Sequence, residues 1–358
     1  MKQPLRVGIL GATGAVGQIF VQLLADHPWF EVAALAASER SAGQTYRDAV
    51  NWIGKQPIPP RIAEMVVQPT KPGLDCDFVF SGLSSSVAGE VERAFAEAGY
   101  PVISNAKNYR MQDDVPLLIP EVNPDHIGLI DEQDWGSDGF IVTNPNCSTV
   151  GLVCALRPLV DAFGVETVQV TTLQALSGAG HPGVPSLDAL GNVIPYIGGE
   201  EDKMATEPTK LLGTLRQGHI APADITVSAQ CNRVPVKDGH TSCVSLKLTN
   251  PASPEAVREA LRDFTSPLAG KGLPTAPSTF IHVDDAEDYP QPDRHVHRGH
   301  GMTVSVGRVR SCEVLDIKFV TLVHNTVRGA AGGAVLNAEL LMQEGYLTPR
   351  RAQATASA

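Results

Sequence analysis

Apolar and polar residues along the N-terminal part of the chain alternate between strand and helix patterns. Residues 6–10 form a short β-branched run, and apolar residues then recur at helical spacing at Val16, Phe20, Leu23 and Leu24. Residues 30–37, FEVAALAA, form a second apolar run of strand length, and residues 76–86, CDFVFSGLSSS, predict a buried strand that ends in a Gly/Ser turn. Strands that alternate with helices in this way predict an α/β fold with a doubly wound parallel sheet.

The middle and C-terminal parts of the chain repeat both patterns. Apolar residues after Cys147 fall at helical spacing, and the residues after His240 alternate as in a half-buried strand. Residues 325–345 form an Ala/Gly-rich helix pattern whose small residues allow close packing, and we expect this helix to return to the first domain. We therefore predict one domain from residues 1–146 plus 324–350, a second α/β domain from residues 147–323, and a disordered tail at residues 351–358.

Composition and charge exclude several classes of protein. A chain of 358 residues exceeds one ordinary core, and 43% hydrophobic with 19% charged residues is typical of a globular protein. The net charge of −11 argues against a general nucleic-acid or membrane-surface binder. The N-terminus lacks the apolar region of a signal peptide, no run is long enough to span a membrane, and the six cysteines are scattered without a CxxC pair. We expect a cytoplasmic protein with reduced thiols.

Glycines follow the first predicted strand directly. The stretch GATGAVG places glycines at 11, 14 and 17, between that strand and the helix that follows it. A tight glycine turn at a helix N-terminus presents free N–H groups and the positive end of the helix dipole to a pyrophosphate. The spacing is GxxGxxG, a variant of the usual dinucleotide fingerprint. It predicts a Rossmann-like domain whose cofactor contacts come from Gly11, Thr13, Gly14, Ala15 and Val16.

The end of the second strand bears on the choice of cofactor. Ser38, Arg40 and Ser41 follow this strand, and an arginine among hydroxyl groups suits a 2′-phosphate, although Glu39 lies beside them. We therefore predict NADP rather than NAD. The Gly/Ser turn after the third strand should lie beside the same crevice and adds Ser81 and Ser84 as weaker candidates.

Cys147 lies in the stretch NPNCST, directly before the predicted helix. A helix N-terminus stabilises a thiolate and lowers its pKa, which predicts a nucleophilic Cys147 that reacts with an aldehyde or acyl phosphate. Cys154 falls inside the apolar stripe and is expected to be a buried structural residue. Arg233 and His240, within NRVPVKDGHT, are the candidate partners: a histidine near a reactive thiol can act as general base, and an arginine can clamp a carboxylate.

Taken together, these stretches resemble the aspartate-β-semialdehyde dehydrogenase family, and within it the archaeal and fungal branch. The resemblance covers nearly the whole chain in family order. It is carried by GATGAVG (11–17), SNAKNYRM (104–111), IPEVN (119–123), VTNPNCSTVGL (142–152), TLQALSGAG (172–180), NRVPVKDGHT (232–241), GMTVSVGRVR (301–310) and HNTVRGAAGGAVLNAELL (324–341).

The resemblance implies a role for each matching residue. It makes Cys147 the nucleophile, His240 the acid/base and Gln174 the residue that orients the intermediate. It assigns the substrate carboxylate to Arg233, the phosphate to Arg110, Asn146 and Lys203, and the substrate amino group to Glu200. Glu207 and Lys210 repeat the spacing of Glu200 and Lys203. The assignment of the amino-group and phosphate contacts therefore stays open between these two pairs. Asn325 is placed near the nicotinamide.

The implied reaction is the NADPH-dependent reductive dephosphorylation of L-aspartyl-4-phosphate to L-aspartate-4-semialdehyde through a cysteine thioester. It belongs to lysine, threonine and methionine biosynthesis. The family also implies a homodimer or homotetramer. Two alternatives stay open: a CoA-acylating malonyl- or succinyl-semialdehyde reductase, which shares the cysteine, histidine and arginine, and an NADP-binding regulatory protein that has lost turnover.

One segment departs from the family pattern. Residues 289–302, YPQPDRHVHRGHGM, carry three histidines: His295, His297 and His300. A His-x-His spacing can bind a metal, but no carboxylate or cysteine completes a ligand set at suitable spacing. We expect a surface loop and no metal site.

Overall fold

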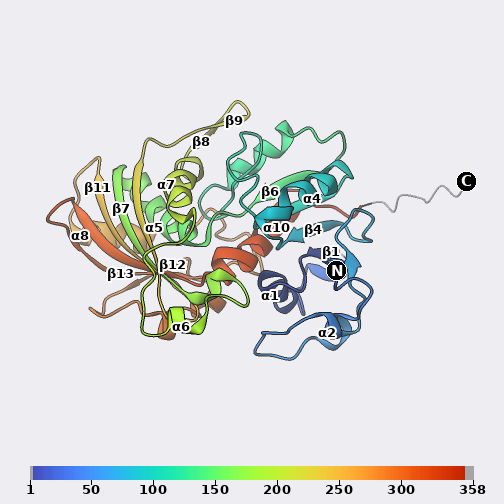
Figure 1. Cartoon of the computed structure of the whole chain (residues 1–358). Coiled ribbons are helices and arrows are strands. Elements are labelled where there is room, and N and C mark those ends of the chain that lie inside the picture. Colours follow the sequence, from blue (N-terminus) through green and yellow to red (C-terminus); the bar gives the residue numbers. More distant parts are fainter. Residues whose placement is uncertain (1–2, 351–358) are drawn as a thin grey trace, which may run out of the picture.

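The structure is a computed structural model that describes residues 3–350, so the predicted tail at 351–358 lies outside the described residues. Two six-stranded sheets and one two-stranded sheet form its framework. Figure 1 shows the two large sheets side by side, with the C-terminal helix, drawn in red, running back from the second sheet toward the first.

The first sheet is parallel, with strand order β3-β2-β1-β4-β5-β6. In this doubly wound order, strands are added first to one side of β1 and then, from β4 on, to its other side. Ligands of such sheets bind at the carboxyl ends of the strands where this change of side occurs, between β1 and β4. The predicted strand at 30–37 is confirmed as β2. The strands are β1 (Leu5–Leu10), β2 (Phe30–Ala37), β3 (Gln68–Pro69), β4 (Phe78–Ser81), β5 (Pro101–Ser104) and β6 (Phe140–Thr143).

Helices on both faces bury the apolar side chains of this sheet. The face toward α1 packs Phe20 against Phe80, with their ring centroids 4.5 Å apart. The C-terminal helix contributes Leu336 and Leu340 to the same core, so the end of the chain is part of the first sheet's packing. The helices of this half are α1 (Ala15–Leu23), α2 (Tyr46–Ala49), α3 (Pro60–Ala63), α4 (Ser85–Glu97), η1 (Pro124–Glu132), η4 (Val327–Ala331) and α10 (Gly332–Gln343).

The second sheet is mixed, with order β10-β7-β11-β14-β13-β12. Helix α5 packs its buried face, including Leu152 and Leu156, against this sheet. The elements are α5 (Cys147–Phe163), β7 (Val165–Gln174), η2 (Leu176–Ala179), α6 (Ser186–Ala189), α7 (Glu200–Leu211), β8 (Thr214–Arg216), β9 (His219–Ala221), β10 (Thr226–Arg233), β11 (His240–Leu248), α8 (Pro254–Asp263), β12 (Ile281–Asp284), α9 (Pro292–His295), η3 (Arg298–Gly301), β13 (Val304–Ser311) and β14 (Ile317–Val323).

The chain passes from the first sheet to the second at residues 144–146. Strand β6 ends at Thr143 in the first sheet, and α5 begins at Cys147 against the second. The short connection therefore places Cys147 between the two sheets. Among residues 3–350, no helix is long and apolar enough to cross a membrane.

Candidate active site

Cys147 is the first residue of α5, as the spacing of apolar residues predicts. Asn146 caps this helix, because its side-chain oxygen accepts the backbone N–H groups of Ser148 at 2.9 Å and Thr149 at 3.2 Å. A side chain that satisfies free N–H groups at a helix start stabilises the helix and fixes its first turn. The cap therefore determines where the thiol of Cys147 stands.

Three adjacent strands of the second sheet, β10, β7 and β11, each place a predicted site residue at the same edge, and one of these residues contacts the thiol. Gln174 ends β7 and Arg233 ends β10, and the parallel register pairs these two residues directly. His240 begins the neighbouring antiparallel strand β11, whose next residue pairs with the residue before Gln174. The sheet thus brings Gln174 next to two residues that lie far from it in the chain, since Arg233 follows it by 233 − 174 = 59 positions and His240 by 240 − 174 = 66 positions.

His240 contacts the thiol through one ring nitrogen and the backbone through the other. The Nε2 atom lies 3.2 Å from Cys147 Sγ, and Nδ1 accepts the Ala175 N–H at 3.1 Å. Burial lowers the pKa of His240 to about 3, so the imidazole is neutral near pH 7. A neutral ring that accepts at Nδ1 carries its proton on Nε2. In this state His240 donates toward sulfur, and the general-base role expected from sequence requires the other tautomer.

The predicted lowering of the thiol pKa is wrong for this state of the protein. Burial raises the pKa of the Cys147 thiol to about 12, and the Glu200 carboxylate acts in the same direction. The nearby guanidinium and ammonium groups oppose this shift without overcoming it. Loss of hydration penalises the charged thiolate, and this penalty is the largest cause of the raised pKa.

Arg233 is held rigidly beside the histidine. Its Nη1 donates to the Ala175 carbonyl at 2.8 Å, and burial lowers the pKa of its guanidinium. Gly178 passes so close that a Cβ there would stand 2.9 Å from Arg233 Nη1 and 3.0 Å from the His240 ring. Gln174 is buried, and its amide donates to Thr172 Oγ1 at 3.2 Å. Any side chain at position 178 would therefore disturb both Arg233 and His240.

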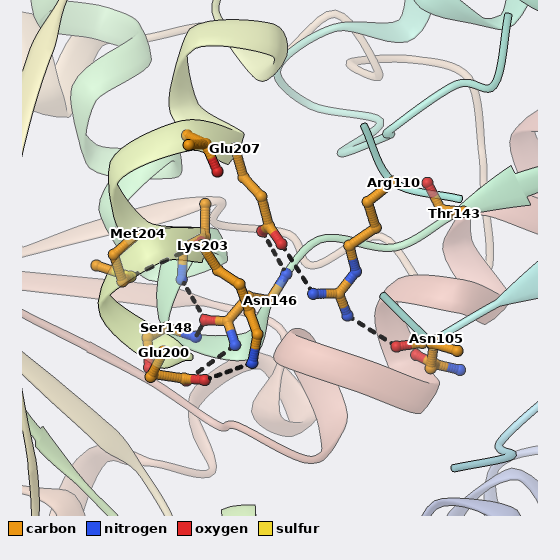
Figure 2. A network of polar contacts seen from close by, with 12 residues as sticks. Asn105, Arg110, Thr143, Asn146, Ser148, Glu200, Lys203, Met204 and Glu207 are labelled. Carbon is orange, nitrogen blue, oxygen red and sulfur yellow. Dashed lines mark hydrogen bonds and ion pairs between the residues drawn. The ribbon is translucent and has the colours of Figure 1, made fainter. Parts of the chain in front are cut away.

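Figure 2 shows the residues predicted to bind an anion, Arg110, Asn146 and Lys203, gathered around Glu200 and Glu207. Asn146 Nδ2 donates to Glu200 at 2.8 Å, and Lys203 Nζ donates to the other oxygen of the same carboxylate at 2.9 Å. Burial works to raise the pKa of Glu200, but the charge of Lys203 and these two hydrogen bonds outweigh it and hold that pKa below its usual value. Glu200 is therefore ionised and fixed.

Two further residues of α7 are committed to the site, although the sequence suggested only that their spacing repeats. Glu207 contacts Arg110 and the backbone of Asn146, and Lys210 contacts the loop that carries Arg110. Both are buried, which a solvated helix face would not produce. The sequence signal for these two residues is that an acidic and a basic residue recur seven and ten positions after Glu200. Glu200, Lys203, Glu207 and Lys210 together form a charged stripe on α7.

The predicted cofactor residues surround the first βα turn. Gly11 has a φ of +75°, and a Cβ at Gly17 would stand 2.3 Å from the Gly11 carbonyl oxygen, so both positions require glycine. Gly14 provides no side-chain cap to α1, whose first N–H groups therefore remain available to a ligand. Thr13, Ala15 and Val16 belong to this same turn and helix start.

The predicted cofactor residues that lie farther from the first βα turn differ in their exposure to solvent and in their hydrogen bonds. Ser38 and Arg40 are exposed at the carboxyl end of β2, with Ser41 half-buried beside them. Ser81 is fully buried, and its hydroxyl donates to Glu92 at 2.6 Å. Ser84 precedes α4, and its hydroxyl lies 2.8 Å from that of Ser86.

Asn325 holds the loops around His240. Its Oδ1 accepts the Gly239 N–H at 2.8 Å, and its Nδ2 donates to Ser177 Oγ at 2.8 Å. Both ends of its amide are thus already bonded within the second half of the chain.

The histidine-rich segment is more structured than expected. His295 ends the short helix α9 and is buried against Tyr289, so the expectation of a surface loop is wrong for this residue. The centroids of the His295 and Tyr289 rings are 4.3 Å apart. His297 and His300 are exposed, as expected. Within residues 3–350, no group of three or more His, Cys, Asp or Glu residues is arranged to hold a metal ion.

Comparison with known proteins relates this geometry to one family. Residues 6–130 match the family profile described as semialdehyde dehydrogenase, NAD binding domain, and residues 156–328 match that described as semialdehyde dehydrogenase, dimerisation domain. The aspartate-semialdehyde dehydrogenase of Archaeoglobus fulgidus is 52% identical over 94% of this chain and 98% of its own length. That of Saccharomyces cerevisiae is 48% identical over 94% and 97%.

A solved structure agrees with these sequence relationships. The crystal structure of aspartate semialdehyde dehydrogenase with NADP from Candida albicans is 47% identical and superposes with a TM-score of 0.89. The match covers 95% of this chain and 99% of that one.

Proposed function

The chain belongs to the aspartate-semialdehyde dehydrogenase family, and from this premise we propose that the site at Cys147 carries the family's reaction. The reaction is the NADPH-dependent reductive dephosphorylation of L-aspartyl-4-phosphate to L-aspartate-4-semialdehyde. The observation that supports it best is the 3.2 Å contact between Cys147 Sγ and His240 Nε2, at the point where the two sheets meet.

Cys147 is the nucleophile of this proposal. Its sulfur attacks the acyl carbon, the bond from that carbon to the phosphate oxygen breaks, and the thiol proton goes to the departing phosphate, so that a thioester joins the substrate to Cys147. Arg233 is proposed to bind the substrate carboxylate, and the anchoring of its guanidinium at the end of β10 beside the histidine supports this role. Glu200 is ionised and suits the substrate amino group.

His240 is proposed to supply a proton during the second half of the reaction. NADPH, once bound, would supply hydride to the thioester carbon. The Nε2 proton of His240 faces sulfur, so it can pass to the sulfur when the carbon–sulfur bond breaks and L-aspartate-4-semialdehyde leaves, while a proton from solvent replaces it on Nε2 and keeps the ring neutral. The Ala175 N–H fixes the ring in the tautomer that this step requires.

The chain's residues fit NADP(H). The glycine turn brings the backbone close to a pyrophosphate, because a Cβ at Gly17 would overlap the Gly11 carbonyl. Arg40 is exposed at the end of β2, between Ser38 and Ser41, where it can pair with a 2′-phosphate. These residues would hold the two charged parts of the cofactor.

The second half of the chain is an oligomerisation domain by its family profile, and we propose a homodimer or homotetramer. Apolar side chains exposed on the segment around α6 support this, among them Leu187, which is 91% exposed, and Tyr196, which is 70% exposed. We also propose a cytoplasmic location, which the six free cysteines favour.

The deciding experiment follows absorbance of the nicotinamide while the protein oxidises L-aspartate-4-semialdehyde. NADP and NAD are compared, each with inorganic phosphate or with CoA. We expect NADP reduction that depends on phosphate, is lost in Cys147→Ala, and is retained in Cys243→Ser, which changes an exposed cysteine. Turnover with CoA alone would instead assign the protein to the acyl-CoA reductases, and no turnover with any combination would contradict an enzymatic role.

A further inference from the structure

The carboxylate of Glu207 joins three segments of the chain at the leaving-group side of the site. We propose that Glu207 is a positioning residue for phosphate, which holds the Arg110 guanidinium and the peptide before Cys147 in one fixed arrangement. This inference rests on the proposed function, because it takes the anion beside Arg110 to be the phosphate that leaves or attacks during the reaction.

The contacts of Glu207 use both of its oxygens. Oε1 accepts Arg110 Nη1 at 2.8 Å, and Oε2 accepts the backbone N–H of Asn146 at 2.7 Å. Arg110 lies in the loop after β5, Asn146 immediately precedes the nucleophile, and Glu207 comes from α7. Figure 2 shows the Glu207 side chain reaching toward both Arg110 and Asn146. One planar carboxylate therefore sets the distance between an anion-binding side chain and the start of α5.

Burial makes this bridge rigid. The side chains of Glu207 and Arg110 are only 2% and 9% exposed, so little water can replace either partner. A buried carboxylate without its donors would lose much of its solvation without compensation. The folded chain therefore strongly favours the single arrangement in which both donors reach Glu207.

The remaining donors of Arg110 indicate what this arrangement is for. Nη2 donates to the Asn105 carbonyl at 2.7 Å, so both terminal nitrogens are anchored by the protein. The Nε atom is buried and, within residues 3–350, has no hydrogen-bond partner. A guanidinium that is anchored at two nitrogens and unpaired at the third is preorganised to donate to an anion without moving.

Lys210 fixes the same loop one turn farther along α7. Its Nζ donates to the carbonyl oxygens of Arg110 at 3.0 Å, Gln112 at 2.5 Å and Val115 at 2.7 Å. Lys210 therefore holds the backbone of the loop, whereas Glu207 holds the Arg110 side chain. The two halves of the charged stripe on α7 thus differ: Glu200 and Lys203 face the nucleophile, and Glu207 and Lys210 hold the loop in place.

Glu207→Gln tests the role because it changes the charge and one oxygen but not the shape. The amide oxygen can accept from Arg110 or from the Asn146 N–H, and the amide NH2 group then faces the other donor. One of the two bonds is therefore lost, and Arg110 is no longer held as in the wild type. Asp202→Asn is the matched control, since it removes the same charge from an exposed position on the same helix.

Phosphate-dependent oxidation of L-aspartate-4-semialdehyde provides the first readout. We expect Glu207→Gln to raise KM for phosphate by about tenfold or more, with KM for the semialdehyde and for NADP changed by less than about twofold. The second readout is the burst of NADPH formed without phosphate, which reports thioester formation. We expect the burst to be retained, because Cys147 and His240 do not need phosphate to form the thioester.

Other outcomes would reject the inference in separable ways. Wild-type protein without phosphate-dependent turnover would overturn the proposed function and this inference with it. Normal wild-type turnover with an unchanged or lower phosphate KM in Glu207→Gln would overturn the positioning role alone. Equal losses in all kinetic constants together with a lower Tm would make Glu207 a residue of the fold. Glu207→Asp keeps the charge but cannot reach both donors, so wild-type phosphate KM in that variant would also reject the role.

Discussion

Alkylation of Cys147 as a function of pH tests the balance between burial and the helix start. The thiol has a pKa of about 12 in the free protein, so about 3 in 100,000 molecules carry the thiolate at pH 7.5, against about one in ten for a free thiol of pKa about 8.5. The higher basicity of the buried sulfur makes each thiolate about 40-fold more nucleophilic. The net expectation is alkylation about 100-fold slower than that of free cysteine.

The assay uses iodoacetamide on the ligand-free protein between pH 7 and 10, with mass spectrometry of the peptide that contains Cys147. We expect the rate to rise about tenfold per pH unit across this range without a plateau. Glu200→Gln should increase the rate at each pH, because the carboxylate raises the pKa of the thiol. Alkylation that levels off at or below pH 8.5 would refute the reasoning and show that the start of α5 outweighs burial.

Three further predictions concern single substitutions. Burial raises the pKa of Glu92 to about 7 from 4.5. The wild type therefore gains stability at low pH and loses it as pH rises through about 7, so its free energy of unfolding relative to Glu92→Gln should fall by about 2.5 kcal/mol between pH 5 and pH 8 in urea denaturation. An unchanged difference would contradict that pKa. Gly329→Ala would place a Cβ 2.7 Å from that of Cys147, and we expect kcat to fall about 100-fold. Gly198→Ala, which meets only an ordinary contact, should keep wild-type kcat, and equal kcat in both variants would count against the steric argument. Asn146→Ala removes the cap of α5 and should cost about 1 kcal/mol in the same denaturation assay, which Asn146→Asp should restore without restoring turnover; no loss in the alanine variant would show the cap to be energetically neutral.

Local patterns were enough to locate the elements that carry the chemistry. The apolar run at residues 30–37 is the full length of β2, and the helical spacing after Cys147 places the start of α5 at that residue. Gly11 adopts the positive φ that a tight turn after β1 requires. These features depend on neighbours within a few residues, and side-chain periodicity and backbone sterics report such neighbours directly.

Other features of the candidate site could not be read from local patterns. The stripe on α7 repeats an acidic and a basic residue, and no spacing rule distinguishes Glu200, which faces the nucleophile, from Glu207, which holds Arg110. The partners of Glu207 lie 97 and 61 positions away in the chain. His295 resembled a loop residue until the fold placed it against Tyr289.

The sequence by itself determined the kinds of groups present and the order of strands, helices and turns that carry them. It placed a cysteine at a helix start, a glycine turn after the first strand and an arginine and histidine around a turn. Only the tertiary structure decided their protonation and their partners. The pKa of Cys147 is raised and His240 carries its proton on Nε2 because sheet packing removes both from water and brings the Ala175 N–H against Nδ1. Desolvation and long-range pairing depend on segments that are distant in the chain, and local sequence patterns do not specify them.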